Sequence, residues 1–223
     1  MFETSPTQSS PFSSPRAGVK ASYGALLAQT MTLVGIALGV LTLGAFVGQD
    51  WTLGASHVAF FIGVGLLFAQ GFIEPLRRGL VGTVALFGIA LALGLGLGPT
   101  LNAYVSVQPD AVAQAVGMTT VTVLGAAALG TFMSKDLARW ARPLSLAIFV
   151  LAIGSYIAFA FGSGIAASPV FSIVFGVISA ALIVIDFNYL RLRATEDDVI
   201  WLATGIFVSI VNLFQIFLNL SRN

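Results

Sequence analysis

The feature that most constrains this chain is a succession of seven apolar segments, each close to the length of a membrane-crossing helix. They cover residues 24–48, 53–73, 79–100, 111–133, 143–162, 168–190 and a last run that ends at Leu220. A helix of about 20 apolar residues crosses the hydrocarbon core of a bilayer. Only 9% of the 223 residues are charged and 57% are hydrophobic, whereas soluble domains carry about 25% charged residues. The sequence therefore predicts an all-α integral membrane protein with seven transmembrane helices.

Composition also excludes several kinds of chemistry. The chain has no cysteine and a single histidine, His57, so disulfides, thiolate chemistry and a His-rich metal site are excluded. Its Lys and Arg residues are scattered between apolar runs and do not form a nucleic-acid surface. The short loops leave no room for a soluble catalytic domain, and an intramembrane hydrolase would need a base near a nucleophile. We therefore predict no enzyme activity, no catalytic residues and no cofactor.

The basic residues divide sharply between alternate loops. Nine of the ten Lys and Arg residues lie in the first 22 residues or in the loops after the second, fourth and sixth segments, and the other three loops contain none. Basic loops mark the cytoplasmic side of a membrane. We predict a cytoplasmic amino terminus and an external carboxyl terminus in the cell (inner or plasma) membrane. Residues 1–22, rich in Ser, Thr and Pro, are predicted to form a disordered cytoplasmic tail before one domain at 23–221.

The last apolar segment carries many polar side chains on one side. At about 100° per residue, five of them fall on an arc of about 140°: Thr204, Ser209, Asn212, Gln215 and Asn219. Polar side chains at membrane depth face the protein interior and avoid lipid. This pattern predicts that the seventh helix lies centrally in the bundle.

Asp186 is the only acidic residue inside an apolar segment, because the other eight lie in the tail or the loops. At that depth a carboxylate costs a few kcal/mol on insertion scales, so it needs a partner or takes up a proton. The alternative is that Asp186 lies in the interfacial zone, about one turn from Arg191. The apolar flank of Phe187, Tyr189 and Leu190 favours the buried interpretation.

Several short motifs resemble, in order and spacing, the bacterial branch of the Bax-inhibitor family. They are residues 96–99 (GLGP), 131–137 (TFMSKDL), 185–188 (IDFN), 195–197 (TED) and 210–214 (IVNLF). Arg77 falls where members of that family carry an arginine at the end of the second helix. The resemblance covers roughly residues 24–220.

The resemblance implies seven helices, with six around a central seventh, and a pH-dependent calcium leak as in characterised relatives. Those relatives use one aspartate on the sixth helix and one on the seventh, which share a proton and contact the second-helix arginine. Asp186 matches the first aspartate. Ser209 stands where the second is expected, so this chain would offer one titrating group and one neutral hydroxyl.

Two functions of different classes remain open. The first is a cation-leak channel or ion-coupled carrier, in which Asp186 attracts the cation and is the candidate metal ligand. Ser209 and Asn212 would supply neutral oxygens, and calcium would be transported cargo. An ion pair between Arg77 and Asp186 would latch the inner mouth. With Ser209 in place of the second aspartate, no carboxylate repulsion raises the pKa of Asp186, and the pair with Arg77 would lower it. The leak is therefore expected to be nearly pH-independent between about pH 6 and 8.

The second function is that of a non-transporting regulator. Such a protein would bind other membrane proteins, for example a protease or a stress-response complex, as some relatives are thought to do. It would show no conductance even with Asp186 intact. In either case the surrounding partner is the lipid bilayer, and no nucleic acid is expected.

Overall fold

The computed structural model describes residues 22–160 and 168–221, and in this part of the chain every regular element is a helix. The elements are α1 Tyr23–Gly48, α2 Leu53–Phe72, η1 Glu74–Arg77, α3 Gly79–Val107, α4 Pro109–Phe132, α5 Ala138–Ala160, α6 Pro169–Leu192, η3 Glu196–Asp198 and α7 Val199–Leu220. The all-α fold with seven long helices is confirmed. The predicted tail up to residue 21 and the predicted end of the fifth segment at Gly162 lie outside the described residues.

Within the described residues, six helices are long and apolar enough to cross a membrane, namely α1, α2, α3, α4, α6 and α7. The chain is therefore a multi-pass membrane protein. Helix α5 begins before the predicted residue 143, so its first turns contain Arg139 and Arg142. Side chains of several residues near its end lie outside the described part of the structure. A seventh crossing through α5 stays a prediction.

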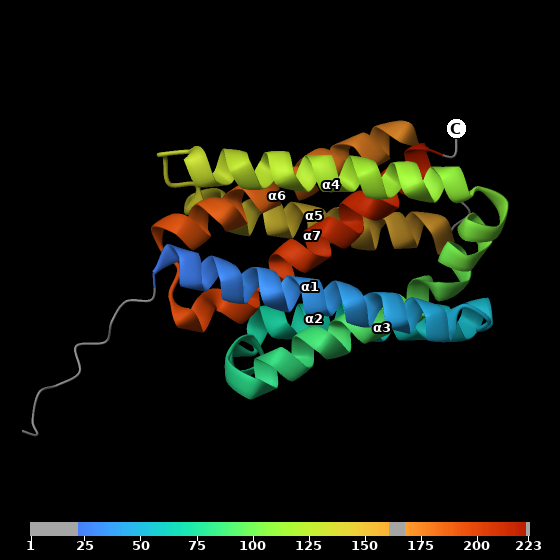
Figure 1. Cartoon of the computed structure of the whole chain (residues 1–223). Helices are drawn as coiled ribbons and strands as arrows, with labels where there is room; N and C mark the ends of the chain where they lie inside the picture. Colours follow the sequence, from blue (N-terminus) through green and yellow to red (C-terminus); the bar gives the residue numbers. More distant parts are fainter. Residues whose placement is uncertain (1–21, 161–167, 222–223) are drawn as a thin grey trace, which may run out of the picture.

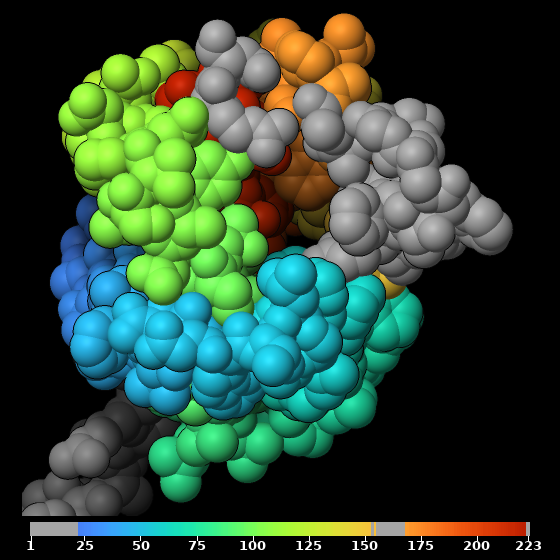
Figure 2. Space-filling model, turned by 90° about the vertical axis from the view of Figure 1, so that its right-hand side faces the viewer, coloured from blue at the N-terminus to red at the C-terminus, as the bar shows by residue number. Residues whose placement is uncertain are grey.

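The helices form two groups that meet on α7. Helices α1 and α2 both pack against α3, and α6 packs against α4 and α5. Helix α7 contacts α1 and α3 of the first group and α4 and α6 of the second. Figure 1 shows α7 running obliquely between the two groups. From the end that Figure 2 faces, red atoms of α7 are visible deep between the α1–α2 turn and the α3–α4 turn.

Helix α7 has the largest share of buried residues among the six spans, as its polar arc predicted. Thr204 and Ser209 are buried, while Asn212 is half-buried and Asn219 is exposed. The apolar side is enclosed as well, because Ile206 is fully buried. Contacts of α7 with α2 and α5 are at most marginal among the described residues. A ring of six helices around α7 therefore stays a prediction.

Glycines set the distance between α1 and α3. On α1, a Cβ added to Gly44 would lie 2.7 Å from the carbonyl oxygen of Leu91, and on α3 a Cβ on Gly94 would collide with the carbonyl oxygen of Leu41. Small residues four apart permit this close approach of membrane helices. On α1, Gly44 and Gly48 therefore pack against the backbone of α3, whereas a Cβ at Gly35 or Gly39 would meet no other helix within 4 Å.

Helix α3 extends further than the sequence predicts, through Pro99 to Val107. Proline cannot bond the carbonyl four residues earlier, which belongs to Leu95. That carbonyl faces α1 at Gly48, where a Cβ would come within 2.6 Å of it. The glycine-rich end of the third segment thus brings two backbones together and does not end the helix. Figure 1 shows the last turns of α3 leading across the end of the bundle towards α4.

The basic loops gather at one end of the bundle. Tyr23 at the start of α1 makes a 3.3 Å hydrogen bond with Thr131 at the end of α4. Arg78, between η1 and α3, lies 3.8 Å from Asp197 in η3. The starts of α1, α3 and α7 and the end of α4 therefore share one face, as the alternation of charge predicts. Which side of the membrane this face occupies stays a prediction.

Gly94→Ala is expected to destabilise the fold by about 1–3 kcal/mol, because the added methyl group would force the backbones of α1 and α3 apart. Gly39→Ala is the matched control, since a Cβ there meets no atom within 4 Å. Thermal unfolding in detergent measures both variants. Equal stability of the two variants would show that α1 and α3 can move apart at little cost in free energy, against this prediction.

A topology reporter fused after Arg222 is expected to behave as external, since seven crossings separate it from the cytoplasmic amino terminus. A reporter inserted after Lys135, in the basic loop between α4 and α5, should behave as cytoplasmic. A cytoplasmic signal from both positions would mean an even number of crossings, and α5 would then be the helix that does not cross.

Candidate functional site

Asp186 lies on α6 at its contact with α7. Its side chain is half-buried, and a Cβ added to Gly205 of α7 would lie 3.1 Å from Oδ2 of Asp186. Gly205, having no side chain, leaves the space that the carboxylate occupies. Within the described residues Asp186 makes no hydrogen bond and no ion pair. The carboxylate is therefore enclosed between two membrane helices without a protein partner.

Two contacts fix the register of α6 against α7. Asp186 lies opposite Gly205, and a Cβ on Gly176 would lie 3.5 Å from Cγ2 of Ile216. Ser209 and Asn212 lie between these two levels on α7, and at about 100° per residue both fall within about 40° of the face that carries Gly205. Ser209 is four residues beyond Gly205, about 6 Å along the helix axis. Helix geometry therefore puts Asp186, Ser209 and Asn212 along one seam between α6 and α7, with Ser209 about one turn away from Asp186.

Arg77 is not part of that seam, which corrects the expected ion pair with Asp186. Its Nε donates a 2.7 Å hydrogen bond to the backbone oxygen of Gln70, and its guanidinium carbon lies 4.6 Å from the ring centroid of Trp201. A guanidinium over an indole face gains about 0.5–1 kcal/mol at exposed sites. Arg77 thus joins η1 to α2 and α7 instead of neutralising the buried carboxylate.

Gln70 continues this network into the bundle. Its side chain is fully buried, and Nε2 donates to the backbone oxygen of Leu76 at 2.9 Å and to Oγ1 of Thr204 at 3.2 Å. Its Oε1 is buried without a hydrogen-bond partner. Thr204 precedes Gly205, so Gln70 and Asp186 approach adjacent residues of α7 from different helices.

Asn188, two residues after Asp186, has a structural role. Its Oδ1 accepts a 3.0 Å hydrogen bond from the backbone N–H of Leu137, and Nδ2 donates to the backbone oxygens of Gly130 and Met133. These groups lie where α4 ends and its helical hydrogen bonds stop, so they need other partners. The buried amide of Asn188 therefore ties the end of α4 to α6.

Charge strengthens the same junction in the loop. Asp136 is ion-paired with Arg193, which follows α6, and accepts a 2.9 Å hydrogen bond from the backbone N–H of Ala138. That backbone hydrogen bond, together with the guanidinium, holds the pKa of Asp136 below its usual value. Arg191 also donates to the backbone oxygen of Thr131. The carboxylate of Asp136 is thus ionised near neutral pH.

The described residues contain no group of three or more His, Cys, Asp or Glu side chains that could hold a metal ion. Calcium takes six to eight oxygen ligands. Asp186 lies apart from the other carboxylates, so it can attract a cation but does not by itself build a stable calcium site.

Sequence reasoning missed Gly205, Gln70 and Trp201. A partial signal existed for Gly205, because it precedes Ser209 by four residues and so shares its helix face. A glutamine near the end of an apolar helix signals a hydrogen-bonding role in the same way. The contact between Arg77 and Trp201 joins residues far apart in the chain, and no local pattern predicts it.

Fold and site together define a multi-pass helical membrane protein with one unpaired carboxylate between two of its helices. Residues 22–223 match the family model described as inhibitor of apoptosis-promoting Bax1, and the chain belongs to this Bax inhibitor-1 family. It is also similar to a protein of Campylobacter jejuni that is described as uncharacterized. The two are 28% identical over 200 residues, which are 89% of this chain and 83% of that protein.

Asn188→Leu is expected to destabilise the protein by at least about 2 kcal/mol, because it leaves three backbone groups of the α4 end without partners. Unfolding in detergent measures the stability of the variant. Limited proteolysis shows whether the α4–α5 loop has become accessible. Asn219→Leu is the control, since Asn219 is exposed near the end of α7. Similar stability of the two variants would count against the anchoring role of Asn188.

Proposed function

We propose that this protein conducts cations, calcium among them, along the contact between α6 and α7. The observation that carries the proposal is Asp186, a carboxylate in a membrane helix that has no protein partner among the described residues. Ionisable groups at membrane depth are costly, and they mark ion and proton pathways. The calcium leak of the relatives that the sequence resembles agrees with this role.

The route begins at Asp186 and continues along neutral oxygens. Ser209 and Asn212 follow Gly205 on one face of α7, and by the same register Ser179 of α6 lies near the level of Asn212. Hydroxyl and amide oxygens can replace part of the hydration shell of an ion. Conduction requires attraction that is strong enough for entry and weak enough for release. One carboxylate followed by neutral ligands suits that requirement.

The proposed route differs from the two-aspartate arrangement in two ways. Ser209 offers a hydroxyl in place of a second carboxylate, and Arg77 is engaged by Gln70 and Trp201. The expectation of a leak that is nearly pH-independent rested on the loss of the second carboxylate and on a pair between Arg77 and Asp186. The second of these two grounds is absent, because Arg77 and Asp186 form no ion pair.

Calcium flux into proteoliposomes tests the route. Asp186→Asn is expected to lower the flux about tenfold or more, which is at least about 1.4 kcal/mol in barrier height, because the amide keeps the shape and loses the charge. Gly205→Ala should lower it less, since the methyl group would displace Oδ2 from its position against α7.

Gly39→Ala is the control for the second variant. It adds the same methyl group to α1, away from the contact between α6 and α7, where a Cβ meets no atom within 4 Å, and should leave the flux unchanged. Equal flux through the unmodified protein and Asp186→Asn would refute the route. A folded protein with no flux at all would favour the non-transporting regulator.

A further inference from the structure

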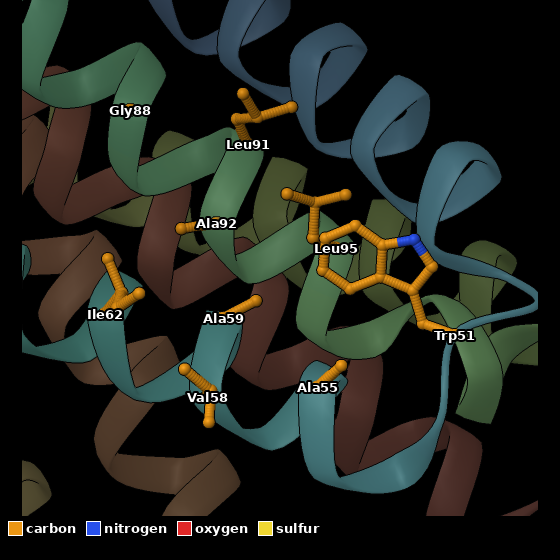
Figure 3. Close-up of a pocket in the computed structure, with 9 residues that line it drawn as sticks. All are labelled: Trp51, Ala55, Val58, Ala59, Ile62, Gly88, Leu91, Ala92 and Leu95. Carbon is orange, nitrogen blue, oxygen red and sulfur yellow. The ribbon is translucent and has the colours of Figure 1, made fainter.

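A groove of about 460 Å³ lies between α2 and α3 on the outside of the bundle. Its floor is made of small residues, including Ala59 and Ala92, which are buried. Its edges are larger side chains such as Val58 and Leu91, which are exposed. Figure 3 shows these side chains on two neighbouring helices with the indole of Trp51 at one end.

The groove matches the depth of one membrane leaflet. Its lining runs from Ala55 to Ile62 on α2 and from Gly88 to Leu95 on α3, two helical turns on each and about 10 Å long. Half of the hydrocarbon core is about 15 Å deep. Because Trp51 lies in the turn before α2, the groove starts at the boundary of the membrane and ends within the same leaflet.

Trp51 provides the single polar group of the lining side chains. Its position is fixed by a 3.0 Å hydrogen bond from its backbone N–H to the oxygen of Gly48. Within the described chain its Nε1 donates to no acceptor. Tryptophan prefers the membrane interface, where the ring meets acyl chains and the N–H meets polar headgroups. An acceptor at the headgroup level would therefore satisfy this donor.

The polarity of the lining identifies the occupant. The lining has no charged side chain, so it offers nothing to a sugar, a nucleotide or a peptide backbone. The apolar lining suits a chain of methylene groups, and the Nε1 donor of Trp51 at one end suits a headgroup oxygen. We propose that the groove binds one acyl chain of a membrane phospholipid, whose phosphate or ester oxygen accepts a hydrogen bond from Nε1 of Trp51.

The preference for this position is modest. A lipid acyl chain moves from the apolar bilayer into an equally apolar groove, so the hydrophobic effect does not drive binding. Van der Waals contact with the walls and the hydrogen bond to Trp51 remain. We expect about five-fold enrichment over other lipid-facing surfaces, equivalent to about 1 kcal/mol.

Photolabelling in phosphatidylcholine proteoliposomes tests this site. A trace of phosphatidylcholine carrying a diazirine in its acyl chain is photolysed, and labelled residues are mapped by peptide mass spectrometry. The lining residues of α2 and α3 should carry the five-fold excess. Gly88→Leu should abolish it, because a Cβ there has room, with Leu66 Cδ1 at 3.9 Å, and the larger side chain fills the groove. Trp51→Phe should lower it by removing the donor.

Gly35→Leu is the matched control, since it adds the same side chain to an exposed position of α1 with no atom within 4 Å. A second groove, of about 310 Å³ beside Trp140 and Ala181, should be labelled equally in all variants. Uniform labelling of all lipid-facing helices, or an excess that survives Gly88→Leu, would overturn the site. An excess of labelling that persists in Trp51→Phe would show that the proposed hydrogen bond does not contribute to binding. A groove that stays unlabelled while the other lipid-facing surfaces are labelled would replace the lipid by a protein interface.

Discussion

The need to keep polar groups of α7 away from lipid is the constraint on which the bundle depends. In a bilayer no water satisfies such groups, so a helix that carries Thr204 and Ser209 must be covered by other helices. The two groups, α1 to α3 and α4 to α6, supply that cover by meeting on α7. Because α7 contacts both groups, any change in their relative position would alter the surroundings of its polar residues.

Close packing outside α7 follows from a different cause. Lipid tails are as apolar as leucine, so hydrophobic burial cannot hold α1, α2 and α3 together, and van der Waals contact must do so. Glycines on α1 and α3 allow backbone contact at Gly44 and Gly94. Between α2 and α3, small residues beside Trp51 are not covered by larger side chains. The space above them is the groove.

The candidate site combines a rigid frame with one carboxyl group, that of Asp186, which has no partner among the described residues. Asn188 and the Asp136–Arg193 pair hold the end of α6 against the end of α4. Arg77 is committed to Gln70 and to Trp201, which lies about one turn before Gly205 on α7. Asp186 therefore lies in a well-anchored helix, and no basic side chain in the described part of the chain pairs with its carboxylate. The residues that anchor α6 are thus different from the carboxylate that faces α7. For this reason the α6–α7 contact is the best candidate for a functional route.

Length, hydropathy and charge are local properties, and they were enough to predict the membrane class, the helical fold, the grouping of basic loops at one end, and Asp186 as a candidate site residue. They did not determine the partner of Arg77, the space that Gly205 leaves for Asp186, or the extension of α3 through Pro99. Each of these depends on which residues of distant helices come into contact. Tertiary packing decided them, since a side chain with several possible partners takes the one that the backbone brings within reach.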